Sequence, residues 1–140
     1  MTKNFSLAEL TASAVALRRH IDNTPGSEAL ASLRLLAHDI LQPLRDAYGK
    51  PILVTSGYRC PALNAAVRGA RGSQHMLGEA ADIKAASAAS PSQLQAENRR
   101  LFELIIALHL PFDQLIDEKD FSWIHVSCSP RQRQQVLHLD

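Results

Sequence analysis

The sequence lacks the features that mark several specialised classes of protein. Its longest uninterrupted apolar run is the five residues 104–108, far short of the roughly 20 residues that a membrane-spanning helix needs. Lys and Arg number 15 against 14 Asp and Glu, which argues against a general nucleic-acid coat or a polybasic membrane binder. Two cysteines cannot build a disulfide framework. We therefore expect no nucleic-acid partner, no membrane anchor and no disulfide scaffold.

What is present fits one soluble globular unit. With 140 residues, 46% of them hydrophobic, the chain is long enough to bury one sizeable core, so we expect a single domain over 1–140 and a monomer. Glu9 falls where a secretory signal would have its apolar region, which predicts a chain made in the cytoplasm. Cys60 and Cys128 could form one bond in an oxidising compartment, but we expect both to be free.

Helical spacing and turn residues divide the chain into helices and strands. The predicted helices run from Ser6 to before Asp22, over 27–48, over 64–67, and from Pro91 to before Pro111. Pro43 is expected to kink the second of them. Strands are predicted at 51–55, 80–83, 113–116 and 123–127, the last two as an antiparallel hairpin. The tail 130–140 shows only weak alternation, and its state stays open. The pattern predicts an α+β fold, a small antiparallel sheet with flanking helices.

The segment 73–82 contains a histidine and an aspartate that one glycine could bring together. On one continuous helix, His75 and Asp82 would lie about 10 Å apart, too far to hold one metal. Gly78 can take a positive φ and turn the chain back, and the small side chains of Ala80 and Ala81 allow a close approach. The spacing therefore favours a turn that places His75 beside Asp82.

A second histidine lies on the predicted strand 123–127. Alternation places Trp123, His125 and Ser127 on one face and two β-branched residues on the core face. Two imidazoles and one carboxylate are the three protein ligands that a catalytic zinc site uses while its fourth position is left for water. Fe(II) oxygenases use the same ligand types, but on jelly-roll strands with a shorter histidine-to-carboxylate spacing than His75 and Asp82 have.

These residues resemble the zinc D-alanyl-D-alanine carboxypeptidases and the phage-type L-alanyl-D-glutamate endopeptidases, which share the hedgehog/DD-peptidase fold. The family pattern of Ser-x-His-x-x-Gly-x-Ala-x-Asp followed by Trp-x-His matches 73–82 and 123–125, and the similarity extends to 55–59 and 63–64. The resemblance implies that His75, Asp82 and His125 are zinc ligands and that Arg59 binds or polarises the substrate. It also implies a peptidoglycan stem peptide as substrate.

One position departs from the family pattern. Several members carry the catalytic acid three residues before the last histidine, where this chain has Ser122. Asp117, Glu118 and Asp120 are the nearby alternatives, and a subgroup of the family carries a Glu after a similar strand. We therefore expect Glu118 to be the general base, since its longer side chain can reach a water molecule from a strand edge.

The remaining polar residues suggest a site with walls of opposite sign. The basic wall would consist of Lys50, Arg59, Arg68 and Arg71. The acidic wall would consist of Asp113, Asp117, Glu118 and Asp120. Ser73 either contacts the substrate or caps a turn, and Trp123 is expected to pack beside the site. The other four histidines show no ligand spacing, and we expect no functional role for them: His20, His38, His109 and His138.

The expected function is a zinc metallopeptidase that hydrolyses peptide bonds in bacterial peptidoglycan. The residues leave open whether the enzyme is a D-Ala-D-Ala carboxypeptidase or an L-Ala-D-Glu endopeptidase. By resemblance to small phage enzymes, we expect an endolysin that reaches the cell wall through a separate phage-encoded pore. The alternative is a non-catalytic, zinc-containing wall-binding module of the same fold, which hydrolysis assays with and without a chelator would distinguish.

Overall fold

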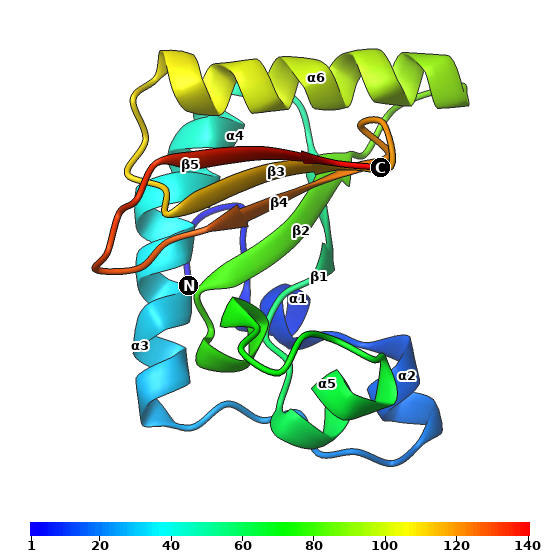
Figure 1. The fold of residues 1–140 in the computed structure, drawn as a ribbon, viewed down its shortest axis with the longest axis vertical. Helices are drawn as coiled ribbons and strands as arrows, with labels where there is room; N and C mark the ends of the chain where they lie inside the picture. The colour runs from blue at the N-terminus through cyan, green and yellow to red at the C-terminus, as the bar shows by residue number, and fades with distance from the viewer.

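A five-stranded sheet forms the centre of the computed structural model, which describes residues 1–140 (Figure 1). In chain order the strands are β1 Ile52–Ser56, β2 Ala80–Ala85, β3 Gln114–Glu118, β4 Trp123–Ser127 and β5 Gln135–Leu139. In space their order is β1-β2-β4-β3-β5. The first four strands pair antiparallel, as predicted, and helices flank the sheet. The α+β class is confirmed.

The tail that the sequence left open is a fifth strand, and it makes the sheet mixed rather than purely antiparallel. β4 runs antiparallel to β3 and ends beside its first residues. The chain passes the start of β3 within residues 128–134 and then runs alongside it as β5, in the same direction. Local alternation carries no information about this pairing, because the partner strand lies earlier in the chain beyond a hairpin.

The helix predicted over 27–48 is present as one rod of three parts. They are α3 Ser27–Leu36, the π-helical turn η1 Ala37–Leu41, and α4 Gln42–Tyr48. Pro43 has no N–H to donate, and its ring crowds the preceding turn of an α-helix. The predicted irregularity is therefore a widened turn directly before the proline, of a kind that often marks interrupted α-helices.

The N-terminal helix is two short helices rather than one. α1 spans Leu7–Thr11 and α2 spans Ala14–Arg18. Ser6 caps the first helix as predicted, but the Ser13 hydroxyl also accepts a hydrogen bond from a backbone N–H and starts the second. Leu17, which has helical spacing from Leu10, is 80% exposed, and Ala16 is the one residue of α2 that is buried. The apolar face of α1 therefore does not continue along α2, and the single-helix prediction is wrong here.

The two faces of the sheet have different roles. α6, Pro91–Ala107, and the α3–α4 rod pack with one face in a continuous hydrophobic core, in which Ile124 and Val126 are fully buried. His125, between them, faces the opposite side, which is bordered by the 3₁₀ turn η2, Gln74–Leu77, and by the loop that follows α5, Pro61–Ala66. None of the helices has the length and apolar character required to cross a bilayer.

Candidate metal centre and substrate cleft

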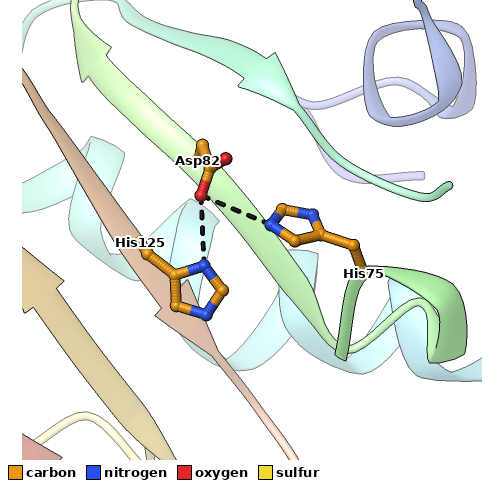
Figure 2. A group of neighbouring side chains, drawn as sticks. All are labelled: His75, Asp82 and His125. Carbon is orange, nitrogen blue, oxygen red and sulfur yellow. Dashed lines mark hydrogen bonds and ion pairs between the residues drawn. The ribbon is translucent and has the colours of Figure 1, made fainter. Parts of the chain in front are cut away.

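A left-handed glycine places the first histidine. η2 ends at Gly78, whose φ is 73°, and the chain then enters β2. A Cβ at this position would lie 2.3 Å from the carbonyl oxygen of Ala29, so a side chain is excluded by space as well as by backbone conformation. The turn brings His75 back beside Asp82, which is the arrangement that the sequence predicts (Figure 2).

Strand register places the second histidine. Asp82 of β2 lies directly opposite His125 of β4, and residues that face each other across antiparallel strands project to the same side. His125 Nδ1 lies 3.1 Å from Asp82 Oδ1, and His75 Nε2 lies 3.4 Å from the same oxygen (Figure 2). One ligand atom from each of the three residues lies within 4.8 Å of the others. Three separate chain segments thus converge on one point.

The tautomer of His75 follows from its partner. Nδ1 lies 2.7 Å from the carbonyl oxygen of Gly57, and because a carbonyl can only accept, Nδ1 must carry the proton. Nε2 therefore faces Asp82: in the imidazolium form it donates to the carboxylate, and in the neutral ring it has the lone pair that a metal ion needs. The backbone carbonyl of His75 in turn accepts a hydrogen bond from the N–H of Arg59, at 3.0 Å. In metal sites generally, the ring nitrogen that does not bind the metal donates to a carbonyl or carboxylate, as Nδ1 of His75 does to Gly57, and this contact fixes the orientation of the ring.

The carboxylate between the two rings is held in its charged form. Burial alone would raise the pKa of the Asp82 carboxyl, but the hydrogen bonds from His125 and His75 outweigh it and hold that pKa well below its usual range. The side chains of His75, Asp82 and His125 are 4%, 13% and 13% exposed. An ionised carboxylate with two imidazoles, nearly enclosed, is chemically suited to a divalent cation.

The donor set and its spacing fit zinc. Four ligands at about 2.0–2.1 Å around a tetrahedral ion lie roughly 3.3–3.4 Å from one another. The two separations to Asp82 Oδ1, 3.1 Å and 3.4 Å, are close to this value. Three such ligands at the wall of an open cleft would leave the fourth position to water or substrate, as in catalytic rather than structural zinc sites.

The candidate metal-binding group, His75, Asp82 and His125, lies in a cleft of about 580 Å³. One wall comes from Arg59, the loop after α5 and η2, and the other comes from β3 and β4. The segment after β4 closes one end of the cleft. Its polar lining, apart from the metal-binding group, is Arg59, Arg68, Ser73, Gln74, Gln114, Glu118, Arg131 and Arg133.

Arg59 lies directly beside the metal-binding group. Its Nη2 is 3.5 Å from Asp82 Oδ2, its Nε donates to Ser56 Oγ at 3.0 Å, and its Nη1 donates to Asn64 Oδ1 at 3.3 Å. These contacts hold the guanidinium at the cleft wall with its side chain 16% exposed. The structure therefore places Arg59 where the sequence predicts it, and it adds Asn64 as the residue that positions it.

Ser73 has a structural contact as well as a place in the cleft. Its hydroxyl accepts a hydrogen bond from the N–H of His75, at 3.2 Å, and so caps η2. The side chain also lines the cleft. A role in substrate binding stays a prediction, whereas the capping contact orders the turn that carries the first histidine.

Glu118 is on the cleft face of β3. Ile116 lies opposite His125, and Glu118 lies two residues further along the same strand and therefore on the same face. The indole Nε1–H of Trp123 donates to Glu118 Oε2 at 3.0 Å, and both side chains line the cleft. Trp123 thus orients the carboxylate in addition to packing beside the site.

The two alternative acids lie elsewhere. Asp117 projects to the other face of β3, is 5% exposed and contacts His138 of β5. Asp120 lies in the hairpin turn and accepts a hydrogen bond from Gln95 of α6 at 3.3 Å. Neither residue lines the cleft.

The predicted pair of oppositely charged walls is wrong. Of the four acids assigned to one wall, only Glu118 lines the cleft, and Asp113 is fully buried against Arg133. On the basic side, Arg59 and Arg68 line the cleft, whereas Lys50 pairs with Glu97 of α6. Acidic residues that lie near a site in sequence can point into the core, because alternate strand positions face opposite sides.

Four polar residues line the cleft that were not predicted from the sequence: Gln74, Gln114, Arg131 and Arg133. Gln74 stands between two motif positions and has no pattern of its own. Arg131 and Arg133 lie in the tail, where their spacing of two was the one available signal. Both cysteines are free, as expected, and burial raises the pKa of the Cys128 thiol to about 11, so it stays protonated near neutral pH.

Comparison with known proteins gives this arrangement a family. Residues 3–127 match the family model described as peptidase M15, which covers every residue of the metal-binding group. The chain belongs to the peptidase M15 family. It is 36% identical over 112 residues to the zinc D-Ala-D-Ala carboxypeptidase of Streptomyces albus G. The alignment covers 77% of this chain but 42% of that relative. The expectation of a zinc cofactor is confirmed at the level of the M15 family.

Proposed function

We propose that this M15 chain is an active zinc peptidase that hydrolyses peptide bonds in bacterial peptidoglycan stem peptides, with His75, Asp82 and His125 as the zinc ligands. The observation that carries the proposal is the convergence of these three side chains, from η2, β2 and β4, at the wall of an open cleft. The name of the Streptomyces albus G relative supports both the metal and the class of substrate.

Bound zinc would lower the pKa of a water molecule and polarise the scissile carbonyl. The chain itself must then move one proton. The carboxylate of Glu118 accepts the proton of the attacking water as the new C–O bond forms, and it returns the proton to the amine nitrogen as the C–N bond breaks. Its place on the cleft face of β3, two residues from the position opposite His125, supports this role.

Arg59 supplies a fixed positive charge at the same place. Its Nε and Nη1 are occupied by Ser56 and Asn64, while Nη2 faces the metal-binding group. A guanidinium held in this way can stabilise either the carboxylate of the substrate or the oxygen that becomes negative during hydrolysis. Ser73 provides a hydroxyl at the cleft lining next to His75 and completes the proposed substrate contacts.

Two stem-peptide bonds are candidates, and each has an observation in its favour. The named activity of the relative favours the D-Ala-D-Ala bond. The cleft favours the L-Ala-D-Glu bond, because it continues along β3 on both sides of the metal-binding group, from Glu118 to Gln114, and so could hold peptide on both sides of the cut. Action on the cell wall, and release through a phage-encoded pore, belong to the same proposal and rest on the resemblance to phage enzymes.

Mass spectrometry of purified peptidoglycan after digestion tests the proposal. A carboxypeptidase removes one alanine from each pentapeptide stem, whereas an endopeptidase releases whole peptides that begin at D-Glu. We expect one of these products from the zinc-loaded protein and neither after chelation, with activity restored by added zinc. A His125→Ala variant is the matched control. A protein that binds zinc and peptidoglycan but yields no product would be the non-catalytic module instead.

A further inference from the structure

Two arginines enter the cleft from a part of the chain that the family match does not cover. The M15 model ends at residue 127, and the segment 128–134 between β4 and β5 contributes Arg131 and Arg133 to the cleft lining. They lie at the end of the cleft formed by Gln74 and Gln114, while Glu118 and Trp123 line the cleft further along β3 and β4. Membership of the family therefore assigns these two residues no role.

Arg133 binds a buried carboxylate through its backbone N–H and two of its five guanidinium donors. Its backbone N–H and its Nε each donate to Asp113 Oδ1 at 2.9 Å, and its Nη2 donates to Oδ2 at 2.9 Å. Gln74 Nε2 donates to the same Oδ2 at 2.8 Å. Asp113 has no exposed surface. The pair fixes the segment after β4 against η2, and Arg133 has two fewer donors for a ligand as a result.

Arg131 has the opposite character. Its side chain is 58% exposed, and its nearest acidic contact, Nη2 to Asp113 Oδ2, is 3.5 Å long. Its backbone is tied to the turn, since its N–H donates to Ser129 Oγ at 3.2 Å. A guanidinium on a backbone held in this way, with donors that no carboxylate occupies closely, is suited to bind an anionic group by two parallel hydrogen bonds.

The charge of the cleft supports an anionic ligand. Four arginines line it against two carboxylates, those of Asp82 and Glu118, although the whole chain carries a net charge of only +1. Asp82 already lies between two imidazoles. The other acid near Arg131 is Glu79, which is half-buried, accepts a hydrogen bond from Gln74 and does not line the cleft. Positive charge concentrated in a cleft attracts substrates with free carboxylates.

We propose that Arg131 binds a carboxylate of the substrate peptide, in a subsite at the Gln114 end of the cleft that is separate from Arg59. Arg133 is the positioning residue that, through Asp113, holds the segment carrying Arg131. The inference rests on the proposed peptidase function and deepens it. It predicts a preference for peptides that carry a further free carboxylate, beyond the one that Arg59 could bind beside the metal.

Two matched pairs of synthetic stem peptides test the subsite. Within each pair the peptides differ only in one carboxylate, which one of them carries as a carboxamide. The replaced carboxylate is at the D-Glu position in the first pair and at the third residue in the second. Hydrolysis is measured for the zinc-loaded wild type, Arg131→Gln, Arg131→Lys and the control Arg34→Gln, which removes the same charge from an exposed position of α3. Arg131→Gln should raise KM for the free acid at least about tenfold with kcat unchanged.

The amide peptide should show no such change, because its neutral group gains little from a guanidinium. Arg131→Lys should recover part of the loss, since it keeps the charge but not the paired donors. Arg34→Gln should behave as wild type. An equal rise in KM for both peptides of each pair, or no rise for any free acid, would overturn the assignment of Arg131.

Fluorescence separates failure of the subsite from failure of the proposed function. Trp123 is the sole tryptophan of the chain and lines the cleft, so its emission should report binding without turnover. Suppose that no peptide is hydrolysed, that the wild type binds the free acid with a lower Kd than the amide, and that Arg131→Gln abolishes this difference. The subsite would then stand, and the peptidase function would be rejected. Equal Kd values for acid and amide in the wild type would reject the subsite whether or not hydrolysis occurs.

Discussion

Asp82 and Asp113 are both carboxylates withdrawn from solvent, and both have a pKa well below the usual range, yet their partners differ. Asp82 lies between two imidazoles, whose hydrogen bonds outweigh the effect of burial. Asp113 lies against Arg133, whose hydrogen bonds are the largest cause of its lowered pKa. An imidazole nitrogen can exchange a proton for a metal ion, whereas a guanidinium stays protonated and offers no lone pair.

The difference shows that a lowered carboxyl pKa does not by itself identify a catalytic site. Structural ion pairs lower a pKa as effectively as functional ones. What distinguishes the two carboxylates is the chemistry of the neighbours and the access from the cleft, because Asp82 lines it and Asp113 does not. Substitution of the two aspartates should therefore have different consequences, one for metal content and one for folding stability.

Asp82→Asn should have the largest effect on function. A neutral amide oxygen is a weaker zinc ligand than a carboxylate, so we expect loss of bound zinc and a fall in hydrolysis of more than about 100-fold. Metal analysis after dialysis and a peptide assay measure the two losses. Asp120→Asn, the same change outside the cleft, should retain both zinc and activity. Stoichiometric zinc in Asp82→Asn would remove this residue from the ligand set.

Glu118→Gln should separate proton transfer from metal binding. Glu118 contacts the Trp123 N–H and has neither the imidazole partners of Asp82 nor the arginine partner of Asp113. The amide keeps the shape but cannot accept a proton, so kcat should fall by about 10²–10⁴-fold while zinc is retained. Should Glu118→Gln remain active while Asp117→Asn or Asp120→Asn is inactive, the general base is that neighbour.

Asp113→Asn should affect stability rather than metal content. The substitution leaves Arg133 without a buried counter-charge, and loss of one partner of such a pair costs about 2–4 kcal/mol after allowance for the partly exposed guanidinium. Denaturant unfolding of the zinc-free protein measures the change without a contribution from the metal. A stable Asp113→Asn protein that fails to bind zinc would contradict the division between the two aspartates.

The smallest expected effect is on acid stability. A carboxyl with a lowered folded-state pKa contributes stability above its unfolded pKa, about 3.9, and loses it as pH falls toward the folded value. The wild type should therefore lose stability more steeply than Asp113→Asn below about pH 4. Urea midpoints at pH 5 and pH 3 give the comparison. Parallel pH dependence in the two proteins would exclude Asp113 as a contributor.

Two parts of the metal-binding group were accessible to sequence reasoning because their determinants are local. Gly78 reverses the chain within a few residues of His75, and strand alternation places His125 opposite the core. The meeting of Asp82 with His125, 43 residues later, depends on strand register and was predicted by resemblance to the family. Glu118 was chosen by resemblance and by side-chain length, since alternation alone was ambiguous, and its catalytic role stays a prediction.

The charge distribution of the cleft was not accessible, because it depends on pairing over long distances in the chain. Asp113 reads as an exposed acid until Arg133 is known to lie against it, and that contact requires β5 to pair with β3. The same holds for Arg131, whose segment has no helical or strand pattern. The break at Ser13 was missed because a serine side chain competes with the backbone wherever tertiary packing does not favour a continuous helix.

The hydrogen bonds of Asp113 also have a consequence for the order of folding. Its carboxylate joins segments that are 39 and 20 residues away in the chain, at Gln74 and Arg133. Closing such loops costs entropy before any contact compensates for it, whereas the turn at Gly78 closes within its own segment. The Gln114 end of the cleft, with Arg131 and Arg133, therefore cannot form until η2, β3 and the segment after β4 are in contact. The turn that carries His75 has no such requirement.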